Sequence, residues 1–177
     1  MLRLFVAVWP PSEVQHNLGE LFRQIPNSDA FHWATPSSFH ITLRFLGETD
    51  KELAASALSG FSFPKTQVLL KPTVEKLGYN ALVIPVEGSD KLADAVLTAS
   101  SHIGQPPKSP YVGHLTVARF KKRAHDSRSS DLLAPMIENV ANAANTVAFA
   151  DFMIAEITLV EVKRNGAYES VERFPLA

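Results

Sequence analysis

The sequence contains no cysteine, which excludes several kinds of chemistry at once. Without cysteine, the 177-residue chain has no disulfide, no thiolate ligand for a metal ion and no cysteine nucleophile. Long apolar runs are also missing, because the N-terminal apolar stretch Leu4–Trp9 stops at two prolines and is far too short to cross a bilayer. This stretch lacks the small-residue cleavage site of a secretory signal. We therefore expect a soluble, cytoplasmic protein with no membrane association.

An excess of charge of either sign is absent too. Seventeen Lys and Arg residues stand against eighteen Asp and Glu residues, a formal net charge of −1. This balance excludes a polycation that binds nucleic acid by charge alone, although a local basic patch could still hold a phosphate. With 46% apolar and 20% charged residues, the composition is that of a globular protein. The length predicts a single domain over residues 1–177.

Apolar periodicity predicts an α+β fold with mostly antiparallel strands. Helical spacing begins at capping boxes Ser12–Gln15 and Thr49–Glu52, and further helices are expected at 92–103 and 131–144. The expected strands, which short connections pair in antiparallel fashion, are 4–9, 39–46, 81–86, 114–118, 147–154, 156–162 and 168–174. Each half of the chain contains a strand with the pattern His-x-Thr that is followed by a helix, which indicates a faint duplication.

Two of these strands carry the same pattern, His-x-Thr. Positions i and i+2 of a strand point the same way, so His40 shares a face with Thr42, and His114 shares a face with Thr116. Strict alternation over 39–46 would also place Arg44 on the His40 face, as a weaker candidate or an exposed strand charge. One such motif alone would carry little weight, but two inside alternating strands indicate a site.

Two imidazoles and two hydroxyls suit the cleavage of a phosphodiester without a metal ion. Histidine titrates near pH 6.5, so one imidazole can act as a base while the other acts as an acid. Threonine hydroxyls can donate hydrogen bonds to the phosphate oxygens that gain charge in the transition state. Two facing halves would place the attacking and leaving oxygens on opposite sides of phosphorus, as an in-line displacement requires.

At these motifs the chain resembles the two-histidine phosphoesterases, and among them the LigT-like RNA 2′,3′-cyclic phosphodiesterases, once named 2′-5′ RNA ligases. Residues 39–47, FHITLRFLG, look like the first motif of the family, and residues 113–119, GHLTVAR, look like the second. The opening residues 3–8 and the C-terminal residues 166–176 are also similar. The chain departs from the pattern at Gly113, where the family usually has proline, and near Glu161–Val162, where a serine is common.

The resemblance implies a bilobal α+β fold with pseudo-twofold symmetry and a central cleft lined by both motifs. It implies hydrolysis of an RNA-terminal 2′,3′-cyclic phosphate, such as that of a tRNA fragment, to a 2′-phosphomonoester, and reverse 2′-5′ ligation. No metal, cofactor or obligate protein partner is expected. His40 and His114 are the expected catalytic residues; we assign His40 as the acid that protonates the 3′ oxygen and His114 as the base. Thr42 and Thr116 are expected to bind the phosphate.

Arg119 is the remaining site residue that the resemblance suggests, as a phosphate contact. It follows Thr116 by three positions, so in an ideal strand it would face away, and only a bulge or the strand end would redirect it. Other residues are open to two interpretations: Trp33 and Tyr111 either stack on a base or pack in the core. Lys121–Arg123 are a solvated run or an RNA contact, and His16, His32, His102 and His125 are surface or structural histidines.

Other functions remain as alternatives. The motif histidines could be ordinary sheet residues or zinc ligands, although no His-x-x-x-His spacing is present. The enzyme could act on a small cyclic phosphate of the ADP-ribose 1″,2″-cyclic phosphate type. A non-catalytic module that binds RNA ends is a further alternative, but binding alone would not need two titratable groups. No Gly-x-Ser-x-Gly, Walker or dinucleotide-binding glycine motif occurs.

Overall fold

Ten strands form one antiparallel sheet in the computed structural model, which describes residues 1–25, 31–121, 134–135, 137–139, 141–142 and 151–177. The strands are β1 (Leu2–Val8), β2 (Phe31–Trp33), β3 (Ile41–Thr49), β4 (Thr66–Leu70), β5 (Glu75–Leu77), β6 (Ala81–Glu87), β7 (His114–Phe120), β8 (Asp151–Ile154), β9 (Glu156–Val162) and β10 (Tyr168–Pro175). Their order is β10-β9-β1-β3-β7-β6-β4-β8, with β2 beside β7 and β5 beside β6. The helices are α1 (Ser12–Arg23), α2 (Lys51–Ser59) and α3 (Asp90–Ala99), with the short 3₁₀ helix η1 (Pro36–Ser38).

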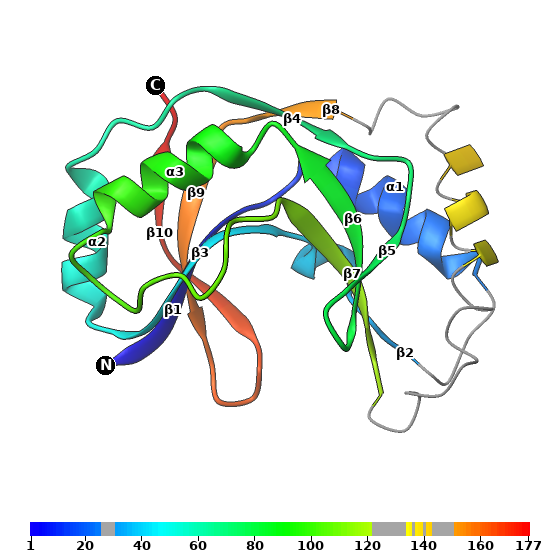
Figure 1. The fold of residues 1–177 in the computed structure, drawn as a ribbon, viewed down its shortest axis with the longest axis horizontal. Helices are drawn as coiled ribbons and strands as arrows, with labels where there is room; N and C mark the ends of the chain where they lie inside the picture. The colour runs from blue at the N-terminus through cyan, green and yellow to red at the C-terminus, as the bar shows by residue number, and fades with distance from the viewer. Residues whose placement is uncertain (26–30, 122–133, 136, 140, 143–150) are drawn as a thin grey trace.

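The sheet consists of two similar halves that meet at β3 and β7. The two strands share a single residue pair, Ile41 with Leu115. Away from this junction β3 pairs with β1, and β7 pairs with β6. The unit β1-α1-β3 therefore corresponds to β6-α3-β7, and Figure 1 shows the halves splayed to either side of the junction. The predicted α+β fold and its duplication are confirmed, and the expected cleft, still a prediction, would lie over this junction.

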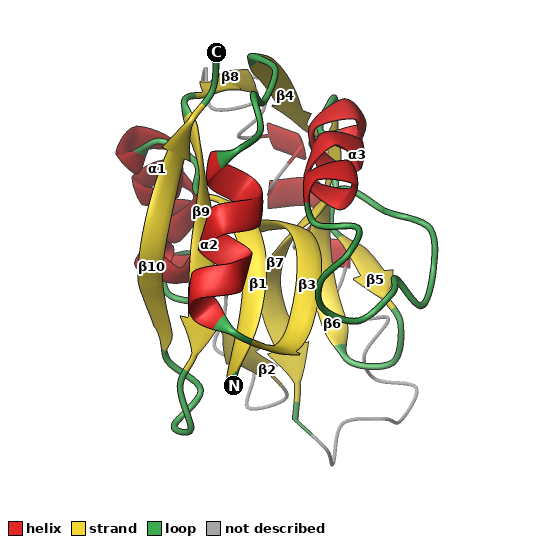
Figure 2. Ribbon diagram, turned by 90° about the vertical axis from the view of Figure 1, so that its left-hand side faces the viewer, coloured by secondary structure: helices red, strands yellow, loops and turns green. Residues whose placement is uncertain are grey.

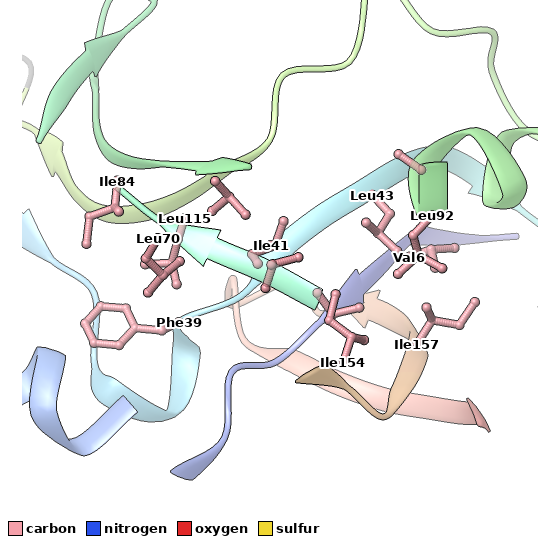
Figure 3. Packing of buried hydrophobic residues seen from close by; sticks show 14 of the residues in the cluster. Val6, Phe39, Ile41, Leu43, Leu70, Ile84, Leu92, Leu115, Ile154 and Ile157 are labelled. Carbon is pink, nitrogen blue, oxygen red and sulfur yellow. The ribbon is translucent and has the colours of Figure 1, made fainter. Parts of the chain in front are cut away.

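One face of the sheet carries the helices and the main hydrophobic core. Residues of α1, α2 and α3 share one buried cluster with alternate residues of the strands, among them Val6, Leu43, Ile84 and Leu115. Figure 3 shows Ile41 in this cluster between the residues of the two halves. The α2 helix lies against β10 at the outer end of the sheet (Figure 2). We call the opposite face of the sheet, which bears the motif residues, the motif face.

Each motif strand contains one extra residue directly after the motif threonine. The pairing of β3 with β1 skips Leu43, and the pairing of β7 with β6 skips Val117. An extra residue of this kind is a β-bulge, and it turns the side chains directly after it to the other face of the sheet. In β3 this applies to Arg44 and Phe45, because the pairing with β1 then skips a second residue, Leu46. Arg44 therefore points into the core, whereas Phe45 and Arg119 turn to the motif face. Burial agrees, since Arg44 is buried while Phe45 and Arg119 are exposed.

The prediction that Arg44 shares the face of His40 is therefore wrong. Its guanidinium lies at the C-terminal end of α3, where it donates hydrogen bonds to the carbonyls of Leu97 and Ile103, each at 3.1 Å, and to the hydroxyl of Ser100. Carbonyls at the end of a helix lack helical partners and carry partial negative charge. Arg44 is thus a structural residue that joins β3 to α3.

Gly113, at the position where proline is usual in the family, lies in a place with no room for a side chain. A Cβ atom there would come within 2.5 Å of the Val86 carbonyl oxygen and 2.7 Å of the Ser89 hydroxyl oxygen. The Gly113 carbonyl accepts a hydrogen bond from Val86 N at 2.9 Å. Close backbone packing therefore explains the glycine and holds the residue before His114 against β6.

Some predicted boundaries differ from the structure. The strand from Ile41 continues past Leu46 to Thr49, and the α2 helix is capped by Asp50, whose carboxylate accepts from Leu53 N at 2.9 Å. The Ser12–Gln15 capping box does not form, since Pro11 is the N-cap and makes no side-chain bond. Half of the predicted helix 131–144 lies outside the described residues, as does the start of strand 147–154, and the described residues 134–135, 137–139 and 141–142 are helical. No helix in the described ranges is long and apolar enough to span a membrane.

Replacing Arg44 should destabilise the fold. In Arg44→Met the two carbonyls and the hydroxyl would stay buried without a donor, and such losses cost about 2–4 kcal/mol in total. Urea unfolding measures the change. As a matched control, Arg173→Met removes an exposed ion pair with Glu156 and should change the free energy of unfolding by less than about 1 kcal/mol. Equal unfolding midpoints for Arg44→Met and the unmodified protein would contradict the structural role.

Candidate active site

The four motif residues meet on one face across the β3–β7 junction. Continuing the antiparallel register from the Ile41–Leu115 pair places His40 opposite Thr116 and Thr42 opposite His114. In a regular antiparallel pair, diagonal neighbours such as the two histidines are separated by roughly 7–8 Å. The topology thus brings together the two histidines and two threonines that the motifs predicted.

Both imidazoles are held by the same local hydrogen bond. Nδ1 of His40 lies 2.7 Å from the carbonyl oxygen of Ser38, and Nδ1 of His114 lies 2.7 Å from the carbonyl oxygen of Val112. A carbonyl can only accept, so Nδ1 carries the proton in both rings. Nε2 is therefore the nitrogen that can take or give a proton in each histidine. This equivalence is what a paired base and acid require.

The surroundings of His40 are aromatic. The ring centroids of Phe5, Trp9 and Tyr168 lie 5.3, 5.4 and 5.0 Å from that of His40, and Tyr168 meets it edge to face. Phe5 itself is fully buried in a small cluster with Ala7 and Val160 on the motif face. No aromatic ring is in contact with His114 among the described residues, so the two histidines sit in different environments.

Burial in this setting lowers the pKa of His40 below its usual value of 6.5. The loss of hydration is the largest cause, because an imidazolium is stabilised less well among aromatic rings than in water. The hydrogen bond to the Ser38 carbonyl raises the pKa in part, and the positive charges of Arg119 and His114 lower it further. The neutral form of His40 is therefore favoured in the unliganded protein.

The threonine hydroxyls are available to a ligand. Thr42 and Thr116 are both half-buried. Neither hydroxyl makes a hydrogen bond to another group within the described part of the chain, so each can donate to an oxygen placed over the junction. Their cross-strand positions put Thr116 beside His40 and Thr42 beside His114.

Arg119 reaches the site because of the bulge at Val117. Its side chain is exposed on the motif face, and its positive charge lowers the pKa of His40. No carboxylate among the described residues forms an ion pair with it. The bulge therefore turns the Arg119 side chain toward the motif face, as a phosphate-binding role for Arg119 would require.

The other candidates lie elsewhere. Trp33 packs on the ring of Phe22 in α1, 5.6 Å between centroids, and is part of the core packing. The Tyr111 hydroxyl donates to Ser89 at 2.9 Å and anchors the loop before β7. Residues 122–130 of the basic segment, with His125, fall outside the described ranges. In those ranges no group of three or more His, Asp or Glu side chains is placed to hold a metal ion.

The aromatic residues around His40 were missed in the sequence. A signal was present for two of them, because Phe5 and Trp9 alternate with Ala7 on one face of the first strand. Tyr168 reaches His40 from the C-terminal hairpin, more than 120 positions away in the chain. No local sequence pattern predicts a contact between residues so far apart in the chain.

Comparison with known proteins finds one family model and several solved structures that are similar to this chain. The sequence model described as "LigT like Phosphoesterase" matches residues 8–71, a range that contains the first motif. No curated protein sequence matches the chain at a significant level. The fold is similar to Escherichia coli LigT in complex with 3′-AMP, with a TM-score of 0.73 at 19% identity, covering 99% of this chain and 98% of that one.

Two further solved structures share the fold. TT0787 of Thermus thermophilus aligns with a TM-score of 0.69 at 20% identity, over 99% of this chain and 98% of that chain. Usb1 of Kluyveromyces marxianus is more distant, with a TM-score of 0.54 at 12% identity, over 98% and 97%. At these identities the structures establish the fold, and the family model establishes the kinship around the first motif. Residues 8–71 thus resemble the LigT-like phosphoesterases in sequence, and the whole chain shares the fold of Escherichia coli LigT.

Proposed function

We propose that this phosphoesterase hydrolyses the 2′,3′-cyclic phosphate at the end of an RNA, such as a tRNA fragment, to a 2′-phosphomonoester. The observation that carries the proposal is the pairing of two equivalent histidines, each with Nδ1 bonded to a backbone carbonyl, across one junction of the sheet. A strained cyclic diester needs one base and one acid on opposite sides of phosphorus, and this arrangement supplies both.

The cyclic phosphate would lie over the β3–β7 junction between the two imidazoles. Thr42 and Thr116 would each donate a hydrogen bond to a non-bridging oxygen of the phosphate. These oxygens gain negative charge as the water attacks, so hydrogen bonds fixed in place beforehand stabilise the transition state more than the ground state. Arg119, on the same face of the sheet, is proposed to bind a phosphate of the substrate.

The reaction is an in-line displacement with balanced proton transfers. The water oxygen forms a bond to phosphorus, and the bond from phosphorus to the 3′ oxygen breaks. Nε2 of one histidine takes the proton of the water, and Nε2 of the other gives its proton to the leaving 3′ oxygen. The phosphate stays on the 2′ oxygen. If the 5′ hydroxyl of a second RNA attacks phosphorus in place of water, the same two proton transfers form a 2′-5′ linkage and release the 3′ hydroxyl.

The environment of His40 favours it as the base. The two motifs offered no physical basis for choosing, and the assignment made from the sequence was the reverse. Burial among the rings of Phe5, Trp9 and Tyr168 favours neutral His40, the form that accepts a proton from water. We therefore propose His40 as the base and His114 as the acid.

The reaction class can be tested with a short RNA that ends in a 2′,3′-cyclic phosphate, incubated with excess EDTA. We expect a 2′-phosphate as the only product and an unchanged rate, because the histidines alone transfer the protons. Adenosine diphosphate ribose 1″,2″-cyclic phosphate, tested in parallel, distinguishes the small-molecule function. Loss of activity with EDTA, a 3′-phosphate product or faster turnover of the ADP-ribose compound would each contradict the proposal.

The pH profile should depend on the rings around His40. As the base, His40 must be neutral, so kcat/KM should fall as the pH drops through its pKa, and burial places this limb below pH 6.5. Tyr168→Ala exposes His40 to water and should move the acidic limb toward 6.5, while the alkaline limb stays in place. A shift of the alkaline limb instead would identify His40 as the acid.

Leaving-group chemistry separates the two histidines in a second way. His40→Ala and His114→Ala should each reduce kcat by about 10²–10⁴. Thr42→Ala and Thr116→Ala should cost about 10²–10³. A substrate with sulfur in place of the 3′ oxygen needs no protonation to leave, so it should restore activity to His114→Ala and not to His40→Ala. Restoration of His40→Ala alone would reverse the assignment, and unchanged kcat in both alanine variants would exclude the mechanism.

A further inference from the structure

The motif face carries a second pair of basic side chains beside the histidines and threonines. His32 in β2 lies directly opposite Arg119 in β7. Residues that pair across strands share a face, so His32 lies on the motif face together with Arg119. Both side chains are exposed, whereas their strand neighbours Phe31 and Phe120 are buried on the other face.

This pair has no evident use in the fold. Neither side chain forms an ion pair with a carboxylate in the described parts of the chain, and neither packs in the core. When His32 is protonated, two positive charges face each other across the strands, which destabilises a sheet. Two basic groups side by side, open to solvent and without an acidic partner, are suited to bind an anion such as a phosphate.

The pair exists in one half of the molecule only. The residue of β3 that corresponds to Arg119, at the same distance past the motif threonine, is Phe45, which is 64% exposed. The motif face therefore has one basic side, around Arg119 and His32, and one aromatic side, around Phe45 and Tyr168. A substrate with a charged end and an uncharged end would bind this face in one orientation.

The position of the pair matches the next phosphate of a nucleotide chain. At the usual rise of a strand, Arg119 lies roughly 7–10 Å along β7 from Thr116. In a nucleotide that ends in a 2′,3′-cyclic phosphate, only the C3′–C4′–C5′ part of one ribose separates this phosphate from the phosphate on the 5′ oxygen. An arginine side chain spans the remaining distance.

We infer that His32 and Arg119 form a subsite for the 5′-phosphate of the nucleotide whose cyclic phosphate is hydrolysed. The inference rests on the proposed function and deepens it, since it defines the substrate class. The subsite favours oligonucleotide ends and 5′-phosphorylated nucleotides over nucleoside 2′,3′-cyclic phosphates with a free 5′ hydroxyl.

The test compares kcat/KM for adenosine 2′,3′-cyclic phosphate with and without a 5′-phosphate. The unmodified protein should prefer the 5′-phosphorylated substrate by on the order of tenfold or more, as charge-assisted hydrogen bonds to a phosphate allow. His32→Ala and Arg119→Met should each reduce this preference severalfold. His16→Ala, which removes an exposed histidine from α1, should keep the preference intact and serves as the control. Equal kcat/KM for the two substrates, or an equal loss on both in His32→Ala, would overturn the subsite.

A binding measurement keeps the subsite testable if neither compound is hydrolysed, an outcome that would count against the proposed function. By calorimetry, adenosine 2′,5′-bisphosphate should bind more tightly than adenosine 2′-monophosphate, again by on the order of tenfold. His32→Ala should remove most of the difference, and His16→Ala should not. Equal affinities of the unmodified protein for the two compounds would overturn the inference whatever the hydrolysis shows.

Discussion

The site depends on one contact, the pairing of Ile41 with Leu115. Because β3 and β7 share only this pair and then follow different partners, each strand keeps its own half of the sheet while its motif stays beside the other. Both residues are fully buried beneath the motif face, where helices of both halves pack. Burial of these side chains, worth about 1.5–3 kcal/mol each, thus fixes the register that aligns each histidine with the threonine of the opposite motif.

The two bulges decide which residues join the motifs. A bulge costs ladder hydrogen bonds, yet both halves contain one at the equivalent place, after Thr42 and after Thr116. Each turns the third residue after the threonine toward the site. In the first half that residue is Phe45, and in the second it is Arg119. The two bulges therefore place an aromatic side chain on the motif face in the first half and a positive charge on it in the second half.

Much of the fold and site could be predicted from the sequence because the signals are local. Alternation and the two His-x-Thr patterns identified the motif strands and the four residues that meet at the junction. Arg44 was misplaced because a bulge leaves no mark in an apolar pattern: Leu43 is apolar whether or not it is paired. The aromatic surroundings of His40 were missed because Tyr168 reaches it only after β10 pairs with β9, and β9 with β1. Contacts of that kind depend on strand order, which no short segment encodes.

The two halves of the sheet have a similar backbone but different side chains around their motifs, and these two features have separate roles. Equivalent Nδ1 hydrogen bonds leave Nε2 of each histidine available to transfer a proton, as the proposed reaction requires. His40 is set apart by its aromatic surroundings and by the charge of Arg119, since burial and that charge both lower its pKa. In the proposed mechanism, the duplicated fold supplies the two histidines, and the residues that break its symmetry decide which histidine acts as the base.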